Sequence, residues 1–270
     1  MDRVEKPLLI ASDVDGTLLD VAERITRRTQ DVLGRVIASG TPFLLVSGRP
    51  PRWIPPVAEQ AGLKGYAVCA NGAVLYDIAA DRVISAHTLD PILLNDVARV
   101  LDETLPGMAL AAERYSPNGS LESFVGERDY INPWGDAEKL SKPRAEVLGH
   151  PAVKLLVRHP DMTSEQMAAA AVPLLKDVVS MTFSTSRGLL EIAQKDVTKA
   201  TGLAEAAELF DIAQADVVAF GDMPNDIPML SWAGHGVAMS NAHPEVLAVA
   251  DEVTAANSED GVAQVLERWF

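Results

Sequence analysis

The sequence has almost no cysteine. Cys69 stands alone among 270 residues, so no disulfide can form within the chain. Such usage is typical of proteins from a reducing compartment. Cys69 lies in the apolar run 66–70, and a cysteine in such a run more often packs as a small buried hydrophobe than acts as a nucleophile.

Long apolar runs and positive charge are scarce as well. The apolar run near the start of the chain is broken by Asp13 and Asp15, so we expect neither a signal peptide nor a membrane span. We therefore expect a cytoplasmic protein with no membrane partner. Lys and Arg number 23 against 38 Asp and Glu, a net charge of −15, which argues against a nucleic-acid partner. Any anionic ligand would need local positive charge from a metal ion or a placed Lys or Arg.

The two ends of the chain contain alternating strand and helix patterns. Such alternation predicts an α/β fold with a parallel sheet and right-handed crossovers. The expected strands are short apolar runs, and the expected helices show apolar residues at helical spacing. In the first part the strands are 8–14, 43–46, 66–70 and 73–76, and the helices are 25–39 and 51–61. In the last part the strands are 189–193, 217–220 and 236–239, and the helices are 198–210, 226–232, 244–248 and 261–269.

The middle of the chain has a different pattern. Helices are expected at 92–104 and 164–175 and strands at 108–112, 153–158 and 179–184, around a polar stretch at 113–149. We interpret residues 83–186 as a separate α+β domain. It is inserted into a discontinuous core made of residues 1–82 and 187–270.

Polar clusters directly follow three of the expected core strands. They are Asp13 to Thr17, Ser47 to Arg49, and the pair Gly221 and Asp222. In an open parallel sheet, ligands bind outside the carboxyl ends of the strands. If these strands are neighbours, the three clusters meet at one edge, and we expect the site there.

Asp13 and Asp15 suggest nucleophilic chemistry at this edge. Gly16 indicates a turn after them, so a plain surface turn is the alternative interpretation. A carboxylate can attack phosphorus and form an aspartyl-phosphate. A phosphate dianion about 4 Å away opposes this by roughly 8 kcal/mol at an effective dielectric of 20. A divalent cation together with a lysine would offset that repulsion.

Candidates for both cations are present. Asp13 and Asp222 are hard oxygen ligands suited to Mg²⁺. Asp226 could hold a metal-bound water or cap the following helix. Lys199, at an expected helix start capped by Thr198, is a candidate phosphate ligand, but spacing alone does not separate it from Lys195.

A further phosphate contact is expected after the second core strand. The Ser47 hydroxyl and the backbone N–H groups that follow it could bind a phosphoryl oxygen. Arg49 could reach the same region or bridge to the inserted domain.

These residues together resemble the haloacid dehalogenase superfamily, and in particular its Cof-like branch of large-capped phosphatases. The Asn71-Gly72 pair also resembles that branch. The resemblance selects Lys199 over Lys195. Its four motifs stand here as Asp13-Val14-Asp15-Gly16-Thr17-Leu18, Ser47-Gly48-Arg49, Asp196-Val197-Thr198-Lys199-Ala200 and Gly221-Asp222-Met223-Pro224-Asn225-Asp226. Asp196 and Ala200 replace glycines that are common in the third motif, which bears on fine geometry and not on catalytic side chains.

The resemblance implies a Rossmann-like core with a cap domain that governs substrate choice. It implies that Asp13 is the nucleophile and Asp15 the acid/base. Mg²⁺ would be held by the Asp13 side chain, the Asp15 carbonyl and the Asp222 side chain, with Asp226 in the same metal site. The phosphate and substrate contacts would come from Gly16, Ser47, Gly48, Arg49, Asn71, Lys199 and Asn225.

The implied activity is Mg²⁺-dependent hydrolysis of a small phosphorylated metabolite, such as a sugar phosphate. A phosphomutase and a non-catalytic regulatory protein on the same core are the alternatives. A dehalogenase would lack the second aspartate, Asp15. Substrate contacts could come from the polar stretch of the inserted domain, at Arg114, Tyr115, Asn118, Glu122, Arg128 and Trp134, or from Lys154 or Arg187. The sequence does not predict the oligomeric state.

Overall fold

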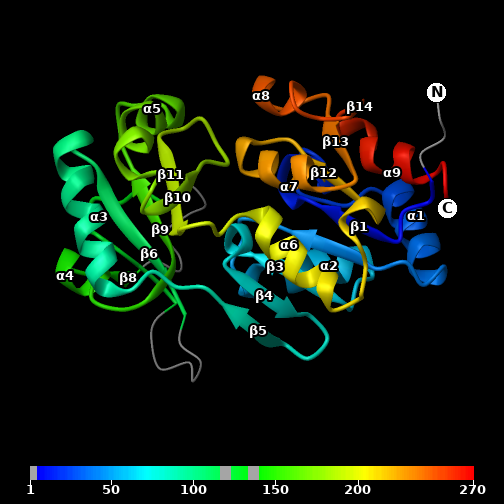
Figure 1. The fold of residues 1–270 in the computed structure, drawn as a ribbon, viewed down its shortest axis with the longest axis horizontal. Helices are drawn as coiled ribbons and strands as arrows, with labels where there is room; N and C mark the ends of the chain where they lie inside the picture. The colour runs from blue at the N-terminus through cyan, green and yellow to red at the C-terminus, as the bar shows by residue number, and fades with distance from the viewer. Residues whose placement is uncertain (1–4, 116–122, 133–139) are drawn as a thin grey trace. The chain divides into compact units, whose positions relative to one another are not determined.

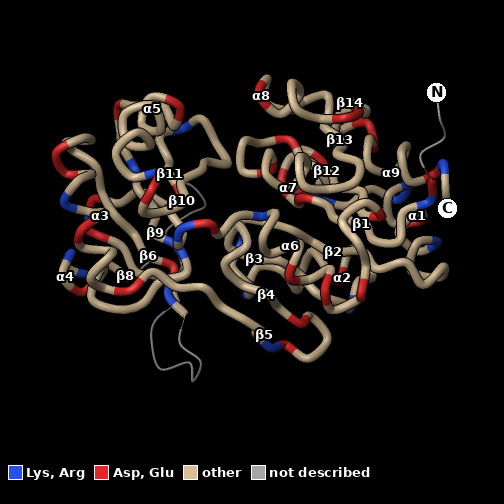
Figure 2. Tube along the Cα trace, in the orientation of Figure 1, with Lys and Arg blue, Asp and Glu red and all other residues tan. Residues whose placement is uncertain are grey.

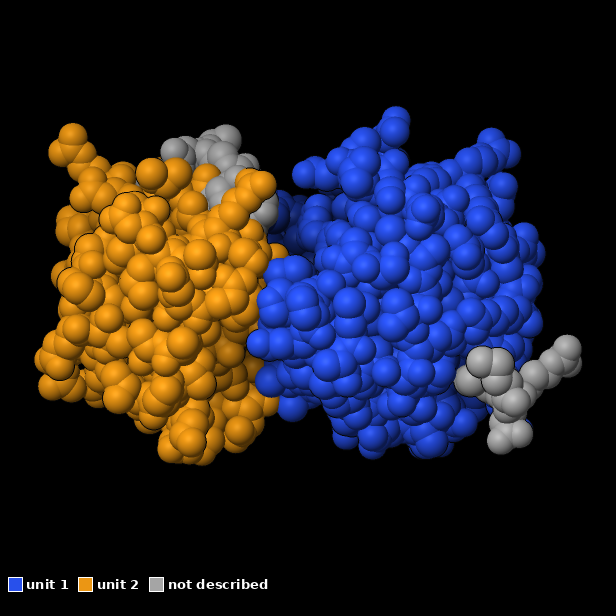
Figure 3. Space-filling view, turned by 90° about the horizontal axis from the view of Figure 1, so that it is seen from above, with its two compact units in different colours: residues 1–85, 198–270 blue, residues 86–197 orange. Residues whose placement is uncertain are grey.

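The computed structural model describes residues 5–115, 123–132 and 140–270. The chain divides into two compact units, coloured separately in Figure 3. The first consists of Met1–Ser85 and Thr198–Phe270, and the second is the intervening segment Ala86–Val197. Three residues expected to reach the substrate, Asn118, Glu122 and Trp134, lie outside the described ranges.

An eight-stranded sheet forms the centre of the first unit (Figure 1). In spatial order its strands are β14 (Glu252–Thr254), β13 (His235–Met239), β12 (Val217–Gly221), β1 (Leu9–Ser12), β2 (Phe43–Val46), β3 (Tyr66–Cys69), β4 (Val74–Asp77) and β5 (Arg82–Ala86). The strands from β14 to β3 pair in parallel, and β4 pairs antiparallel with β3. The predicted α/β class with a parallel sheet is therefore confirmed.

The strand order reverses at β1. From β1 the chain moves through β2 to β3 on one side, and it returns much later through β12 to β14 on the other. Leu9 aligns with Val217 and Ile10 with Phe43, so the carboxyl ends of β12, β1 and β2 are neighbours. A reversal of this kind is where open α/β sheets bind ligands.

Among the described residues, six helices belong to the first unit. They are α1 (Arg27–Ala38), α2 (Pro55–Ala61), α6 (Lys199–Glu208), α7 (Ile227–Trp232), α8 (Pro244–Leu247) and α9 (Gly261–Leu266). Helices α6 and α7 bury Leu203, Met229 and Leu230 against one face of the sheet, beside Leu9 and Val46. Helix α1 packs against α2 and α9. The expected helix 51–61 is divided, because the α-helix begins only at Pro55, after a short 3₁₀ turn at Pro51–Trp53.

The second unit contains a six-stranded sheet. Its order is β10 (Val179–Thr182), β11 (Leu189–Gln194), β9 (Ala152–Arg158), β6 (Ala109–Arg114), β7 (Phe124–Gly126) and β8 (Leu140–Ser141). The pairs are antiparallel except that between β7 and β8. Its helices are α3 (Pro91–Thr104), α4 (Arg144–Val147) and α5 (Ser164–Leu175).

Strand β11 corrects the expected division of the chain. The sequence analysis assigned residues from 187 onward to the core, but β11 pairs with β9 and β10 in the second sheet. The charged residue of this strand explains its position. Glu191 is buried and accepts a hydrogen bond from Lys154 of β9 at 2.6 Å. An apolar strand pattern predicts burial but does not identify the sheet to which the strand belongs. The ion pair identifies it, because Lys154 lies on β9 of the second sheet.

Charged residues of both signs are distributed along the described chain. Figure 2 shows Lys and Arg positions interspersed with Asp and Glu along the described trace. Among the described residues, none of the helices combines the length and apolarity that crossing a membrane requires.

Candidate active site

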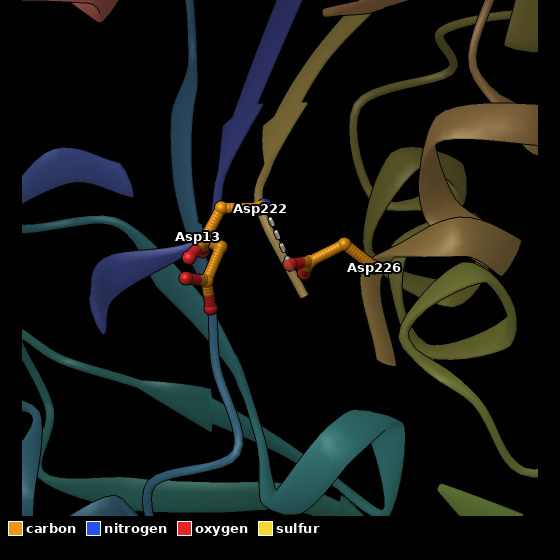
Figure 4. Close-up of side chains that lie close together, drawn as sticks. All are labelled: Asp13, Asp222 and Asp226. Carbon is orange, nitrogen blue, oxygen red and sulfur yellow. Dashed lines mark hydrogen bonds between the residues drawn. The ribbon is translucent and has the colours of Figure 1, made fainter. Parts of the chain in front are cut away.

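Three carboxylates meet where β1 and β12 end. Asp13 follows β1, Asp222 follows β12, and Asp226 comes from the short 3₁₀ turn Pro224–Asp226 that precedes α7 (Figure 4). One carboxylate oxygen of each lies within 4.8 Å of the others. All three residues are buried. Two strands that are distant in sequence but adjacent in the sheet therefore bring three acids to one point.

Burial and mutual repulsion alter the acidity of this cluster. Burial raises the pKa of Asp13 well above its usual value, although the Lys199 ammonium opposes the shift. Burial also raises the pKa of Asp222 to about 7, and the nearby Asp226 carboxylate adds to the rise. A site that makes both carboxylates costly to ionise favours a cation between them.

Lys199 supplies one such cation from the first residue of α6. Its Nζ donates to Asp13 Oδ1 at 2.5 Å and to Asp226 Oδ1 at 2.6 Å, and its side chain is completely buried. The two carboxylates raise the pKa of Lys199 against the opposing effect of burial, so the ammonium stays charged. Thr198 caps the helix by accepting a hydrogen bond from Thr201 N, which fixes where α6 begins. Lys195, the competing candidate, is exposed.

Both carboxylate oxygens of Asp226 accept hydrogen bonds within the site. Its Oδ1 accepts from Lys199, and its Oδ2 accepts from the backbone N–H groups of Asp222 and Met223, both at 2.9 Å. Its side chain does not cap α7. Asp226 therefore links Asp222 and Lys199, and it lies in the same group of three carboxylates that could hold a metal ion.

Asp15 differs from the other acids because it points to solvent. Its side chain is 55% exposed and forms a two-pronged ion pair with Arg49. Arg49 Nε donates to Asp15 Oδ2 at 2.8 Å, and an Nη donates to Oδ1 at 2.6 Å. The structure thus brings these two residues together, and the Asp15 carboxylate is still near enough to help raise the pKa of Asp13 and of Asp222.

Gly16 is required by the backbone turn that follows Asp15. Its φ is +80°, and a Cβ there would lie 2.3 Å from Asp222 Oδ2. Two residues absent from the expected site hold the same turn. Thr17 donates its hydroxyl to Asp222 Oδ1 at 2.9 Å, and Asn241 donates to the Gly16 carbonyl at 2.9 Å. Thr17 stands within the first motif, whereas Asn241 carries no signal in the sequence.

Ser47 and Gly48 begin a second turn beside the first, after β2. Ser47 is completely buried, and its Oγ accepts the Arg49 backbone N–H at 3.1 Å. Its carbonyl accepts from Asn71 N at 3.0 Å, so this turn packs against the turn after β3.

Asn71 and Asn225 join that neighbouring turn to the acid cluster. Asn225 donates its Nδ2 to Asn71 Oδ1 at 3.1 Å. Asn225 Oδ1 is buried and has no hydrogen-bond partner within the described ranges. A buried polar atom in this condition indicates that a ligand or water completes the site.

Comparison with known proteins agrees with this geometry. The profile of the haloacid dehalogenase-like hydrolases matches residues 10–266. The chain belongs to this family. The membership expected from the four motifs is thereby confirmed, and the match of this hydrolase spans both compact units.

Relatives and solved structures cover nearly the whole length. A candidate phosphatase of Haemophilus influenzae is 31% identical over 267 residues, covering 97% of each chain. The 5-amino-6-(5-phospho-D-ribitylamino)uracil phosphatase YitU of Bacillus subtilis is 29% identical over 279 residues, covering 98% of each. The haloalkanoate superfamily phosphatase BT1666 of Bacteroides thetaiotaomicron has a similar fold, with a TM-score of 0.80, 24% identity and coverage of 99% of this chain and 97% of its own.

Proposed function

We propose that this hydrolase is a Mg²⁺-dependent phosphatase that acts on a small phosphorylated metabolite through an aspartyl-phosphate on Asp13. One observation carries the proposal. Asp13 is buried beside the Asp222 carboxylate, and Lys199 Nζ holds it at 2.5 Å. A nucleophilic carboxylate that must approach an anion needs positive charge beside it to offset the repulsion between the two.

Charge balance supports the assignment of each cation. A phosphate dianion beside Asp13 meets a repulsion of roughly 8 kcal/mol at an effective dielectric of 20. An ammonium has three N–H groups, and Lys199 uses two of them on Asp13 and Asp226. We assign the third to a phosphoryl oxygen. Lys199 then offsets part of the repulsion, and a divalent cation offsets the rest.

The donor set fits Mg²⁺. Asp13 and Asp222 offer carboxylate oxygens, the hard ligands that this ion prefers. Only glycine fits at position 16, because a Cβ there would meet Asp222 Oδ2 at 2.3 Å. We assign the ion to the side chains of Asp13 and Asp222 and the carbonyl of Asp15. Asp226 lies outside this set because both of its oxygens accept hydrogen bonds, whereas Asp13 and Asp222 each accept on one oxygen in the described part of the chain. When bound, Mg²⁺ would neutralise phosphoryl charge as a Lewis acid.

The reaction takes two displacements at phosphorus. An Asp13 oxygen attacks, the bond from phosphorus to the ester oxygen breaks, and Asp15 gives that oxygen its proton so that an alcohol leaves. Asp15 then takes a proton from water as the water oxygen attacks the aspartyl-phosphate. The bond between Asp13 and phosphorus breaks, releasing inorganic phosphate and restoring both carboxyl groups.

The remaining assignments concern phosphoryl and substrate contacts. We assign these contacts to Gly16, Ser47, Gly48, Arg49, Asn71 and Asn225. The assignment of Asn225 is supported by its buried Oδ1, which has no hydrogen-bond partner among the described residues. We assign substrate choice to the second unit, Ala86–Val197, where Arg114, Tyr115 and Arg128 are candidates. The name of the YitU relative, a phosphatase of a phosphorylated ribityl compound, supports a sugar-like phosphate. Cys69 is the single cysteine of the sequence, so no disulfide can form within the chain, and this supports a cytoplasmic location.

Hydrolysis of an aryl phosphate, measured as release of inorganic phosphate, tests the function. We expect activity with Mg²⁺, none with EDTA, and none in Asp13→Asn. Asp15→Asn should lower turnover strongly while still accumulating phosphoenzyme. Wild-type turnover by Asp13→Asn would refute the nucleophile. Transfer of the phosphoryl group to a sugar without phosphate release would indicate a mutase instead.

A further inference from the structure

The ion pair with Arg49 engages the Asp15 carboxyl, which is the group that the proposed reaction needs as its acid and base. Both Asp15 oxygens accept hydrogen bonds from the Arg49 guanidinium, at 2.8 and 2.6 Å. An acid/base carboxyl must carry a proton on one oxygen and present it to the ester oxygen. A proton on either oxygen would lie beside a cation that already holds both oxygens, so the ion pair opposes the acid form of Asp15. We therefore expect the pair seen here to open during each turnover.

Arg49 is anchored beside the turns that we assign to the phosphoryl group. Its backbone N–H donates to Ser47 Oγ at 3.1 Å, and its carbonyl accepts from Ala70 N at 2.9 Å. The backbone is thus fixed, and only the long side chain can change direction. Its side chain is 20% exposed, against 55% for Asp15, so the guanidinium is the more enclosed of the two partners.

A phosphate ester is a stronger partner for the guanidinium than Asp15. A guanidinium binds phosphate in the same two-pronged manner as carboxylate, and a phosphate dianion carries twice the charge. A partly exposed ion pair shifts an equilibrium by only about twofold to fivefold. The Asp15 pair is therefore weak enough for an arriving phosphate to displace.

We propose that Arg49 couples substrate binding to the release of Asp15. In the resting enzyme its guanidinium holds Asp15, and on binding it moves to the substrate phosphate, which frees Asp15 to act as acid and base. Arg49 is a positioning residue for Asp15 in the first state and a substrate ligand in the second. This inference rests on the proposed phosphatase function and deepens it.

A double-mutant cycle on phosphate binding tests the competition. Binding of inorganic phosphate with MgCl₂ is measured by calorimetry for the wild type, Asp15→Asn, Arg49→Met and the double variant. Asp15→Asn removes a negative charge, so some tightening is expected in any background. If Asp15 competes for Arg49, the gain should be about twofold to fivefold larger with Arg49 present than with Met at that position. Equal gains in the two backgrounds would overturn the inference.

A matched pair controls for the loss of surface charge. Arg28 makes a similar exposed two-pronged pair with Glu267, at 3.0 and 2.6 Å, which joins α1 to the end of α9. The same cycle on Arg28→Met and Glu267→Gln should leave phosphate affinity unchanged. A coupling in this pair as large as that at Arg49 would show that the effect is general electrostatics and would overturn the inference.

Steady-state kinetics distinguishes this coupling by Arg49 from a merely structural role of the residue. Arg49→Met should raise KM by about tenfold or more, because a charged hydrogen bond to substrate is lost, while kcat changes less, because Asp15 is already free. Arg49→Lys keeps the charge without the fork and should recover part of KM. An equal loss in kcat with unchanged KM would refute the coupling. If wild-type protein neither binds phosphate nor hydrolyses the ester, the proposed function fails as well, whereas hydrolysis with additive binding defeats only this inference.

Discussion

Removal of Lys199 should destabilise the first unit more than most single substitutions. In Lys199→Met the carboxylates of Asp13 and Asp226 lose the ammonium that lies 2.5 and 2.6 Å away. Their side chains are 7% and 0% exposed, so water cannot replace it. Breaking a buried pair by removing one partner costs about 3–5 kcal/mol. Two carboxylates share the loss here, so we expect about 4 kcal/mol or more.

Urea unfolding followed by tryptophan fluorescence measures this effect. Trp53, Trp232 and Trp269 lie in the first unit, so the signal reports mainly on the unit that contains the site. Lys195→Met is the matched control, since Lys195 is exposed and its loss should cost less than about 0.5 kcal/mol. If both variants unfold at the same urea concentration as the wild type, the buried ion pairs do not stabilise the fold and the reasoning is wrong.

The loss in free energy of unfolding caused by Lys199→Met should also depend on pH, in a direction that follows from the pKa of Asp13. Burial already raises the pKa of Asp13 above its unfolded value, and loss of the opposing ammonium raises it further. A carboxyl whose folded pKa is raised destabilises the fold increasingly as pH climbs from the unfolded to the folded pKa. The difference from wild type should therefore shrink as the pH is lowered from 8 to 5. A deficit that grows on acidification would contradict this sign.

Three further outcomes follow from the site. Gly16→Ala should abolish Mg²⁺ binding and hydrolysis, because the φ of Gly16 is +80° and a Cβ there would lie 2.3 Å from Asp222 Oδ2. The control Gly34→Ala in α1, with open space around the new Cβ, should keep both properties and gain up to about 1 kcal/mol in the free energy of unfolding. Loss of Mg²⁺ binding in both variants would refute the clash. Calorimetry should show Mg²⁺ binding about tenfold tighter at pH 8 than at pH 6, because a proton competes for Asp222, whose pKa is about 7, and pH-independent affinity would count against Asp222 as a ligand. Gly72→Ala should cost about 2 kcal/mol or more by urea unfolding, since its φ is +101° and a Cβ would lie 1.9 Å from the Thr198 carbonyl, and wild-type stability would show that the start of α6 can move.

Local patterns predicted much of the sheet and the start of the key helix. The apolar run 43–46 coincides with β2, and Thr198 caps α6 as expected, because burial and capping leave marks within a few residues. The sheet to which residues 189–194 belong could not be predicted in this way. An apolar strand reads alike in either sheet, and the partner that decides it, Lys154, lies 37 residues from Glu191.

The sequence predicted which residues would meet at the sheet edge but not which contacts they would make there. Strand ends identified Asp13 and Asp222, since neighbouring parallel strands deliver their last residues to one edge. The bridge from Lys199 to both Asp13 and Asp226 depends on the direction of one side chain. The pair between Asp15 and Arg49 likewise depends on which of several nearby charges each group meets, and no spacing in the sequence encodes that choice.

The reversal of strand order at β1 has a consequence for how the protein is made. One edge of β1 pairs with β2 early, but its other edge waits for β12, about 200 residues later in the chain. Synthesis at roughly 5–20 residues per second leaves that edge open for about ten to forty seconds. The second unit, which is contiguous, emerges complete during this interval. A nascent chain therefore carries Asp13 at the end of a strand that is paired along one edge only, until Lys199 and Asp222 arrive. The last third of the chain both closes the sheet and assembles the site.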